Sequence, residues 1–262
     1  MSRDGLALRI RFALPQSLTA LRALLGLYLI FLVAQGHLYT AATIWLFGLL
    51  TDVADGTLAR GLGVCSRFGH VFDLIADYMY HVLVPAFMSF FMIGENAGTL
   101  GLLLLSLPSP CAAMRYARKA GLRDSEYPGI PASPGLGTIA YGLYVAALVF
   151  FRREGMVEPR TLAWLLLGGT PALSILMVAR TRYPKLGVYA WIVYPILAGL
   201  MILPFLQTTT LLWVMMGLIA FYVFLSPLLI DQHPERAGKR AAAPGRIRFR
   251  TPVEETPARG RP

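Results

Sequence analysis

The chain has 262 residues, of which 56% are hydrophobic and 15% charged, and its mean hydropathy is +0.59. This much apolar surface excludes a single water-soluble domain, because one core cannot bury it, and predicts an all-α, polytopic membrane protein. The net charge of +10 fits basic loops beside anionic lipid better than it fits nucleic-acid binding.

Apolar windows divide the chain into about eight candidate spans, since a helix that crosses a bilayer needs ~20 mostly apolar residues. We expect one membrane domain over residues 15–230, preceded by a short interfacial helix in residues 1–14, where basic and apolar side chains alternate. Residues 231–262 are rich in Arg, Pro, Ala and Gly, which predicts a disordered cytoplasmic tail, either solvated or bound to anionic lipid. The expected spans are 15–35, 39–61, 68–93, 98–119, 135–152, 161–179, 186–205 and 208–230.

Basic residues fall mostly on one side of the membrane if every span crosses once, which places that side in the cytoplasm. Arg152, Arg153 and Arg160 are the exception, and Glu154 and Glu158 only partly offset them. These residues conflict with the orientation expected for the fifth and sixth spans.

The two cysteines, Cys65 and Cys111, lie in or beside apolar stretches without metal-ligand or CxxC spacing. We therefore interpret both as reduced packing residues and predict no disulfide.

Four aspartates lie in or next to the second and third apolar segments. Asp52 and Asp55 are three residues apart, and Asp73 and Asp77 are four apart, so each pair shares one face of its helix. Four converging carboxylates near hydrocarbon require neutralisation by metal or by protons. Oxygen ligands suit Mg²⁺ or Mn²⁺, which also bind phosphate oxygens, so the cluster predicts a pyrophosphate site.

Small and basic residues accompany these aspartates. Gly56 and Ala59 have small side chains, which leave space for a ligand on one face of their helix, and Gly69 leaves space on the neighbouring helix. Arg60 has a planar guanidinium that can bind phosphate. Close helix packing is the alternative explanation for the two glycines.

Intramembrane carboxylates also occur in ion-coupled transporters, which are the alternative class. A transporter would explain single aspartates, but it leaves the glycines, alanine and arginine at fixed offsets without a role. The joint pattern therefore favours an enzyme.

This joint pattern resembles the signature of the CDP-alcohol phosphotransferase family. The resemblance implies a helical, homodimeric enzyme of a prokaryotic inner membrane, with a polar cavity that opens to the cytoplasm. The activity it implies is transfer of a phosphatidyl group from CDP-diacylglycerol to a small alcohol, with release of CMP. The residues that carry the resemblance are Asp52, Asp55, Gly56, Ala59, Arg60, Gly69, Asp73 and Asp77.

The resemblance also implies a role for each of these residues. The four aspartates would hold two divalent ions, Mg²⁺ or Mn²⁺, and Asp77 would also act as the general base for the acceptor hydroxyl. The residues that would contact the CDP moiety are Gly56, Ala59, Arg60 and Gly69.

The start of the first span is similar to that of the family's first helix. It contains Pro15, Gln16, Leu18, Thr19 and Arg22, with glutamine where asparagine is commoner. The similarity implies that Thr19 contacts the nucleotide.

Three further stretches resemble the phosphatidylserine synthase subgroup, which implies L-serine as acceptor. They are FDLIADYMYHVLVPAF (72–87), AMRYARK followed by YPGIPASP (113–119 and 127–134), and LMVARTRYPK (176–185). Lys119, Ala120 and Leu74 depart from that subgroup, and Tyr78 departs from the glycerol-phosphate subgroup. Inositol phosphate, glycerol phosphate or another polar alcohol therefore stay open as acceptors.

Arg115 and Arg118 are three residues apart at the cytoplasmic end of the fourth span. They are candidates for binding the carboxylate of the acceptor or the lipid phosphate, and basic flanking of a span is the alternative. We expect His70 and His81 to be packed or interfacial, with a proton-shuttle role as the alternative.

Overall fold

The computed structural model describes residues 3–63, 66–93, 97–121, 132–184 and 209–229, and it is mostly helical. Within these ranges, the side chains of residues 3–12, 50–60, 121, 132–134, 184, 209–211 and 229 lie outside the description. The predicted span 186–205 and the predicted tail 231–262 also lie outside the described residues. Both therefore stay predictions.

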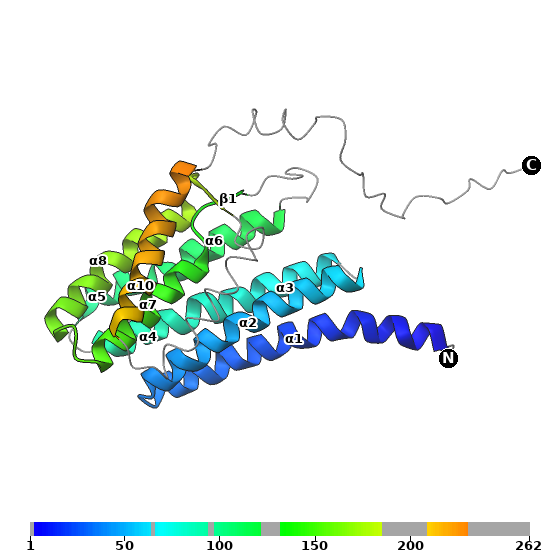
Figure 1. Cartoon of the computed structure of the whole chain (residues 1–262), viewed down its shortest axis with the longest axis horizontal. Coiled ribbons are helices and arrows are strands. Elements are labelled where there is room, and N and C mark those ends of the chain that lie inside the picture. The colour runs from blue at the N-terminus through cyan, green and yellow to red at the C-terminus, as the bar shows by residue number, and fades with distance from the viewer. Residues whose placement is uncertain (1–2, 64–65, 94–96, 122–131, 185–208, 230–262) are drawn as a thin grey trace, which may run out of the picture.

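Three helices at the start of the chain form one side of the molecule (Figure 1). Helix α1 (Arg3–Ala34) packs along α2 (Leu38–Leu62) and also contacts α3 (Arg67–Tyr78). The turn between α1 and α2 uses Gly36, whose φ of 82° suits a residue without a Cβ atom. Because α1 lies against both other helices, it can place a side chain next to the later residues of α3.

Helix α3 continues without a break into a π-helical turn, η1 (Met79–Leu83), and then into α4 (Val84–Ile93). The N–H of Val84 donates to the carbonyl of Met79, five residues earlier. Pro85 explains this turn, because a proline inside an α-helix has no N–H and its ring clashes with the carbonyl four residues before it. The wider turn removes that clash and lets the helix continue.

Helix α7 (Thr138–Arg153) occupies the centre of the described part of the chain, and most of its side chains are buried. It contacts α2, α4, η1, α8 and α10. The remaining helical elements are α5 (Gly98–Ser106), α6 (Pro108–Gly121), α8 (Pro159–Val178), α10 (Thr209–Ala220), η5 (Phe221–Leu225) and η6 (Ser226–Leu229).

The expected helical fold is confirmed for the described residues, with the addition of two short strands. Strand β1 (Ala132–Pro134) pairs antiparallel with β2 (Arg182–Pro184), and three residues are too few to produce a readable alternation in a sequence. Burial raises the pKa of Tyr183, which therefore stays a neutral hydroxyl. The strands connect the start of α7 to the end of α8.

Gly135 follows β1 and lies directly against the end of α8. Its φ is 77°, and a Cβ atom at this position would lie 2.1 Å from the carbonyl oxygen of Met177. The neighbouring N–H of Leu136 donates to the carbonyl of Leu176 at 2.9 Å. Only glycine fits so close to the Met177 carbonyl. The N–H of Leu136 then supplies a hydrogen-bond partner to the Leu176 carbonyl, near the end of α8.

Four helical segments in the described residues are long and apolar enough to cross a membrane. They are Ala13–Ala34, Arg67–Ile93, Gly98–Ala120 and Pro159–Val178. The apolar part of α2 and the α10 region are shorter, and α7 has 16 residues. The predicted number of eight spans therefore stays a prediction, while four of the eight predicted segments have a helix of spanning length.

The first predicted span, 15–35, coincides with the apolar part of α1, Ala13–Ala34. Helix α1 starts at Arg3 and runs through Ala34 without interruption, so residues 3–14 of the expected interfacial segment belong to the same helix as the span. Leu24 and Phe31 are 63% and 58% exposed on α1, which suits a helix that faces lipid.

Candidate active site

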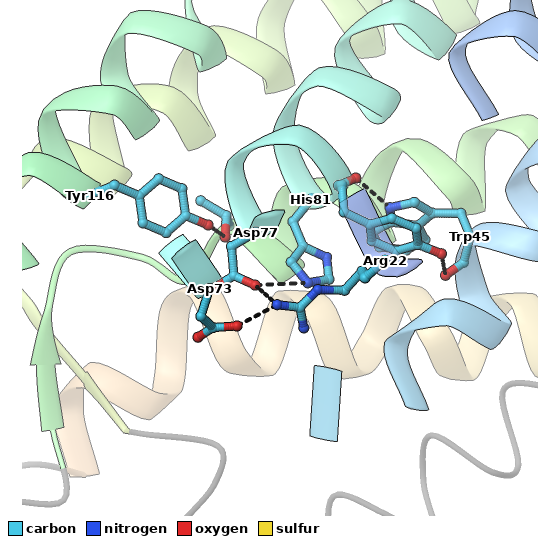
Figure 2. A network of polar contacts seen from close by, with 8 residues as sticks. Arg22, Trp45, Asp73, Asp77, His81 and Tyr116 are labelled. Carbon is cyan, nitrogen blue, oxygen red and sulfur yellow. Dashed lines mark hydrogen bonds and ion pairs between the residues drawn. The ribbon is translucent and has the colours of Figure 1, made fainter. Parts of the chain in front are cut away.

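Two of the four predicted aspartates lie together on α3 and point at an arginine of α1 (Figure 2). Asp73 and Asp77 are one helical turn apart, so both carboxylates lie on the same side of α3. The Arg22 guanidinium donates a hydrogen bond to Asp73 and forms an ion pair with Asp77, with Nη2 3.1 Å from Oδ1. The structure thus brings the predicted pair together and adds a cation that the predicted site did not contain.

Burial differs among these three charged side chains. Arg22 is 0% exposed, Asp77 is 16% exposed and Asp73 is 38% exposed. A buried arginine without a carboxylate partner is strongly destabilising. Separation of Arg22 from Asp73 and Asp77 would therefore be costly. The more open carboxylate of Asp73 leaves room for a ligand on its outer side.

Arg22 is the residue of this site that sequence reasoning missed, although it belonged to the motif at the start of the first span. A signal was present, because a lone arginine inside an apolar segment is costly and usually faces a polar interior. Spacing along the chain did not indicate its partners, which are 51 positions away in the case of Asp73.

His81 lies one turn beyond Asp77 on the same helix and approaches the same carboxylate oxygen as Arg22 (Figure 2). Its Nε2 is 3.7 Å from Oδ1 of Asp77, and the side chain is 1% exposed. The ring packs edge-on against Trp45 and Tyr80. The expectation of a packed histidine is confirmed, and its position beside Asp77 keeps the proton-shuttle alternative open.

The other aspartate pair lies on α2, which joins α3 through a short connection around residues 63–66. The backbone of α2 includes Asp52, Asp55, Gly56, Ala59 and Arg60, but their side chains lie outside the described part of the structure. Among the residues whose side chains the structure describes, no three His, Cys, Asp or Glu side chains lie close enough together to bind one metal ion. The roles assigned to these five residues therefore stay predictions.

The predicted nucleotide contacts Thr19 and Gly69 flank the cluster. Thr19 is buried on α1, one turn before Arg22, and its hydroxyl donates to the carbonyl of Pro15 at 3.1 Å. The N–H of Gly69 donates to the Oγ of Ser66 at 3.0 Å, which caps the start of α3. Both residues lie on elements that carry the charged cluster, and their contact with nucleotide stays a prediction.

Arg115 and Arg118 differ in their surroundings, although both lie on α6. Arg115 is 5% exposed, and none of the described residues hydrogen-bonds to its Nε. Helix α6 packs against α3, the helix that carries Asp73 and Asp77. Arg118 instead donates to the carbonyl of Val178 at 2.9 Å, at the end of α8. Arg115 is therefore the buried cation of this pair, on a helix that packs against α3.

Tyrosine hydroxyls next to the cluster form contacts that the sequence did not indicate. Tyr78, which follows Asp77 directly, forms a hydrogen bond with Ser109 of α6. Tyr116 forms one with Thr138 of α7 at 2.7 Å, and its ring packs edge-on against Tyr78. Together these bonds fix α3, α6 and α7 around the side of the site that contains Arg115.

Comparisons with known proteins identify the family to which this chain is similar. A profile described as CDP-alcohol phosphatidyltransferase matches residues 12–176, a range that contains every charged residue described above. Two proteins of Helicobacter pylori strains 26695 and J99, both named CDP-diacylglycerol–serine O-phosphatidyltransferase, are 27% and 28% identical over 80% of this chain and 89% of their own length. A phosphatidylcholine synthase of Borreliella burgdorferi is 24% identical over 79% of this chain and 88% of its own length.

The profile covers well over half of the chain, and the relatives extend over most of it. The four apolar helices suit an integral membrane protein, and the match decides between the two classes that the sequence left open, the enzyme and the transporter. The chain belongs to the CDP-alcohol phosphatidyltransferase family.

Proposed function

We propose that this enzyme transfers a phosphatidyl group from CDP-diacylglycerol to L-serine and releases CMP. The observation that carries the proposal is a buried arginine, Arg115, on α6, which packs against the helix α3 whose carboxylates Arg22 holds together. A base and an anion-binding cation on adjacent helices suit an acceptor that has both a hydroxyl and a carboxylate.

The donor set suits a hard divalent ion. The two described carboxylates, Asp73 and Asp77, share one side of α3, and carboxylate oxygens are the ligands that Mg²⁺ and Mn²⁺ prefer. With Asp52 and Asp55 they would hold two such ions. When bound, the ions would neutralise the negative charge that develops on the pyrophosphate.

Arg22 adjusts the charge of this site. Four aspartates carry four negative charges, two dications carry four positive charges, and Arg22 adds one more positive charge. The loaded site would therefore be positive overall, which favours a pyrophosphate ligand. Arg22 also orients the two carboxylates of α3 before any ligand binds.

Asp77 is the proposed general base. Its carboxylate takes the proton of the serine hydroxyl, the hydroxyl oxygen forms a bond to the lipid-side phosphorus, and the bond from that phosphorus to the CMP oxygen breaks. The proton stays on Asp77 until it passes to water or to the departing CMP. Ion pairing with Arg22 fixes the carboxylate for this step.

Serine is preferred over choline because of Arg115. Choline has no carboxylate and carries a positive charge, so a buried guanidinium repels it. Inositol phosphate and glycerol phosphate are anionic and would also suit Arg115, but the serine-specific names of the two Helicobacter relatives favour serine. The proposal includes a homodimer in a prokaryotic inner membrane, with the site open to the cytoplasm.

A CMP-release assay tests the proposal. The purified full chain would receive CDP-diacylglycerol with Mg²⁺ or Mn²⁺ and, separately, L-serine, choline, inositol phosphate or glycerol phosphate. We expect CMP release with serine, its loss on chelation with EDTA and its return when either metal is added. Release with another acceptor but not with serine would overturn the acceptor assignment. Undiminished release in EDTA would overturn the metal assignment.

A further inference from the structure

An aromatic pair links α2 to the π-helical turn η1, about one helical turn beyond Asp77 along the chain. Trp45 and Tyr80 are both 0% exposed. The indole N–H of Trp45 donates to the carbonyl of Tyr80 at 2.9 Å, and the Tyr80 hydroxyl donates to the carbonyl of Trp45 at 2.9 Å. The two rings stack with centroids 6.1 Å apart and planes 10° apart.

The π turn makes this reciprocal pair possible. In a regular α-helix the carbonyl of Tyr80 would accept from the N–H of Val84, but that N–H donates to Met79 instead. Pro85, the next residue, has no N–H to offer. The carbonyl of Tyr80 is thus available to the indole of Trp45, and a buried carbonyl without any partner would be costly.

Gly48 lets the tyrosine reach α2. A Cβ atom at residue 48 would lie 1.8 Å from the Tyr80 hydroxyl oxygen and 2.4 Å from the ring carbon that carries it. The ring is buried and bonded at its end, so it has little freedom to move aside. Gly48 is therefore required for this separation between α2 and η1.

The position of the pair along both helices connects it to the aspartates. Gly48 precedes Asp52 by one turn of α2, and Tyr80 follows Asp77 by about one turn of the third helix. The pair thus joins α2 to the helix that carries Asp73 and Asp77, at one end of the segments that contain the four aspartates. Any rotation or separation of the two helices would change the distance between the two carboxylate pairs.

We propose that Trp45 and Tyr80 are positioning residues, which set the rotation and separation of α2 and α3 so that the two aspartate pairs face one another. This inference rests on the proposed function, because it assumes that the four aspartates act as one metal site. Gly48 and Pro85 support the same arrangement. Gly48 leaves space for the Tyr80 ring, and Pro85 produces the π turn.

A second tyrosine–glycine contact provides matched controls. On α7 and α8, the Tyr144 hydroxyl donates to the carbonyl of Leu165 at 2.7 Å. A Cβ atom at Gly169 would lie 2.3 Å from that hydroxyl oxygen. Tyr144→Phe and Gly169→Ala therefore impose the same kinds of change as Tyr80→Phe and Gly48→Ala, on helices that carry none of the four aspartates.

The first measurement is Mn²⁺ binding to the full chain in detergent, followed by electron paramagnetic resonance together with thermal unfolding. We expect Tyr80→Phe and Gly48→Ala to raise the Mn²⁺ dissociation constant about tenfold or more, the range seen when groups that orient metal ligands are lost. The two control variants should lower thermal stability by a similar amount and leave Mn²⁺ binding unchanged. Wild-type affinity in Tyr80→Phe, or equal weakening in the controls, would overturn the inference.

The second measurement needs no metal and separates this inference from the proposed function. Hydrogen–deuterium exchange of the metal-free chain should be faster over residues 50–62 and 67–78 in Tyr80→Phe, and not in Tyr144→Phe. If the wild type binds no Mn²⁺, the metal part of the proposed function fails and this exchange result still decides the positioning role. Unchanged exchange over both segments in Tyr80→Phe would overturn that role.

Discussion

Arg22 and Asp77 form an ion pair with Nη2 and Oδ1 3.1 Å apart, although one belongs to α1 and the other to the end of α3. The same guanidinium hydrogen-bonds to Asp73. One buried cation thus fixes both carboxylates of α3, and this organises half of the aspartate cluster without any bound ion.

Replacement of Arg22 should make folding depend on metal. Arg22→Gln leaves two carboxylates next to each other without their buried cation, and breaking a buried ion pair costs about 3–5 kcal/mol. We expect a lower Tm without metal, and a larger rise in Tm on addition of Mg²⁺ than the wild type shows. Thermal unfolding with and without Mg²⁺ measures both values.

The control for this change is Arg152→Gln. Arg152 donates to the carbonyl of Met92 at 2.9 Å and contacts none of the four aspartates among its described interactions. Its replacement should leave the effect of Mg²⁺ on Tm at the wild-type value. An Arg22→Gln protein that gains no more from Mg²⁺ than this control would contradict the role of Arg22.

Removal of the proposed base should stop turnover without removal of the binding site. Asp77→Asn keeps an oxygen that can accept from Arg22, but it no longer accepts a proton, so we expect CMP release to fall about 10²- to 10⁴-fold. Titration of CDP into the variant should show binding close to that of the wild type. Unchanged turnover would exclude Asp77 as the base.

Arg115 should affect the acceptor more than the donor. A buried charged hydrogen bond contributes about 1.5–3 kcal/mol, so Arg115→Gln should raise KM for serine by about tenfold or more. The KM for CDP-diacylglycerol should change little. Steady-state kinetics with each substrate varied in turn separates the two effects.

Arg118→Gln is the natural comparison, because the Arg118 guanidinium already donates to Val178. We expect it to change KM for serine less than Arg115→Gln does. A larger change in KM for serine in Arg118→Gln than in Arg115→Gln would indicate that Arg118, and not Arg115, contacts the acceptor.

The first turn of α3 should depend on Ser66. Its Oγ accepts from the N–H of Gly69 at 3.0 Å, and loss of such a cap costs about 1 kcal/mol. Ser66→Ala should therefore lower Tm and reduce CMP release. Ser106→Ala, which removes an exposed bond to the carbonyl of Leu103 at the end of α5, should change neither value appreciably.

Gly135 should tolerate no side chain. Gly135→Ala would force a Cβ atom to within 2.1 Å of the Met177 carbonyl oxygen, at a φ of 77° that disfavours alanine. We expect a clear loss of Tm, since the contact with the end of α8 must open. Gly155→Ala, also at positive φ but with no atom within 4 Å of the added carbon, isolates the backbone cost alone.

The sequence by itself determined the family of this protein and the shared helical face of one aspartate pair. Its apolar content required a membrane, and the spacing of Asp73 and Asp77 placed both carboxylates on one helical face. These inferences succeeded because they depend on local properties, namely hydropathy over a window and the periodicity of a single helix. The family resemblance rested on the same fixed offsets.

Only the tertiary structure decided what surrounds those carboxylates. Arg22 pairs with residues of another helix, and Trp45 bonds to Tyr80 through a carbonyl that a π turn leaves available. Neither contact has a period along the chain, because each depends on how two distant helices are rotated against one another. Side-chain packing in three dimensions sets that rotation, so these partners became visible only once the helices were placed together.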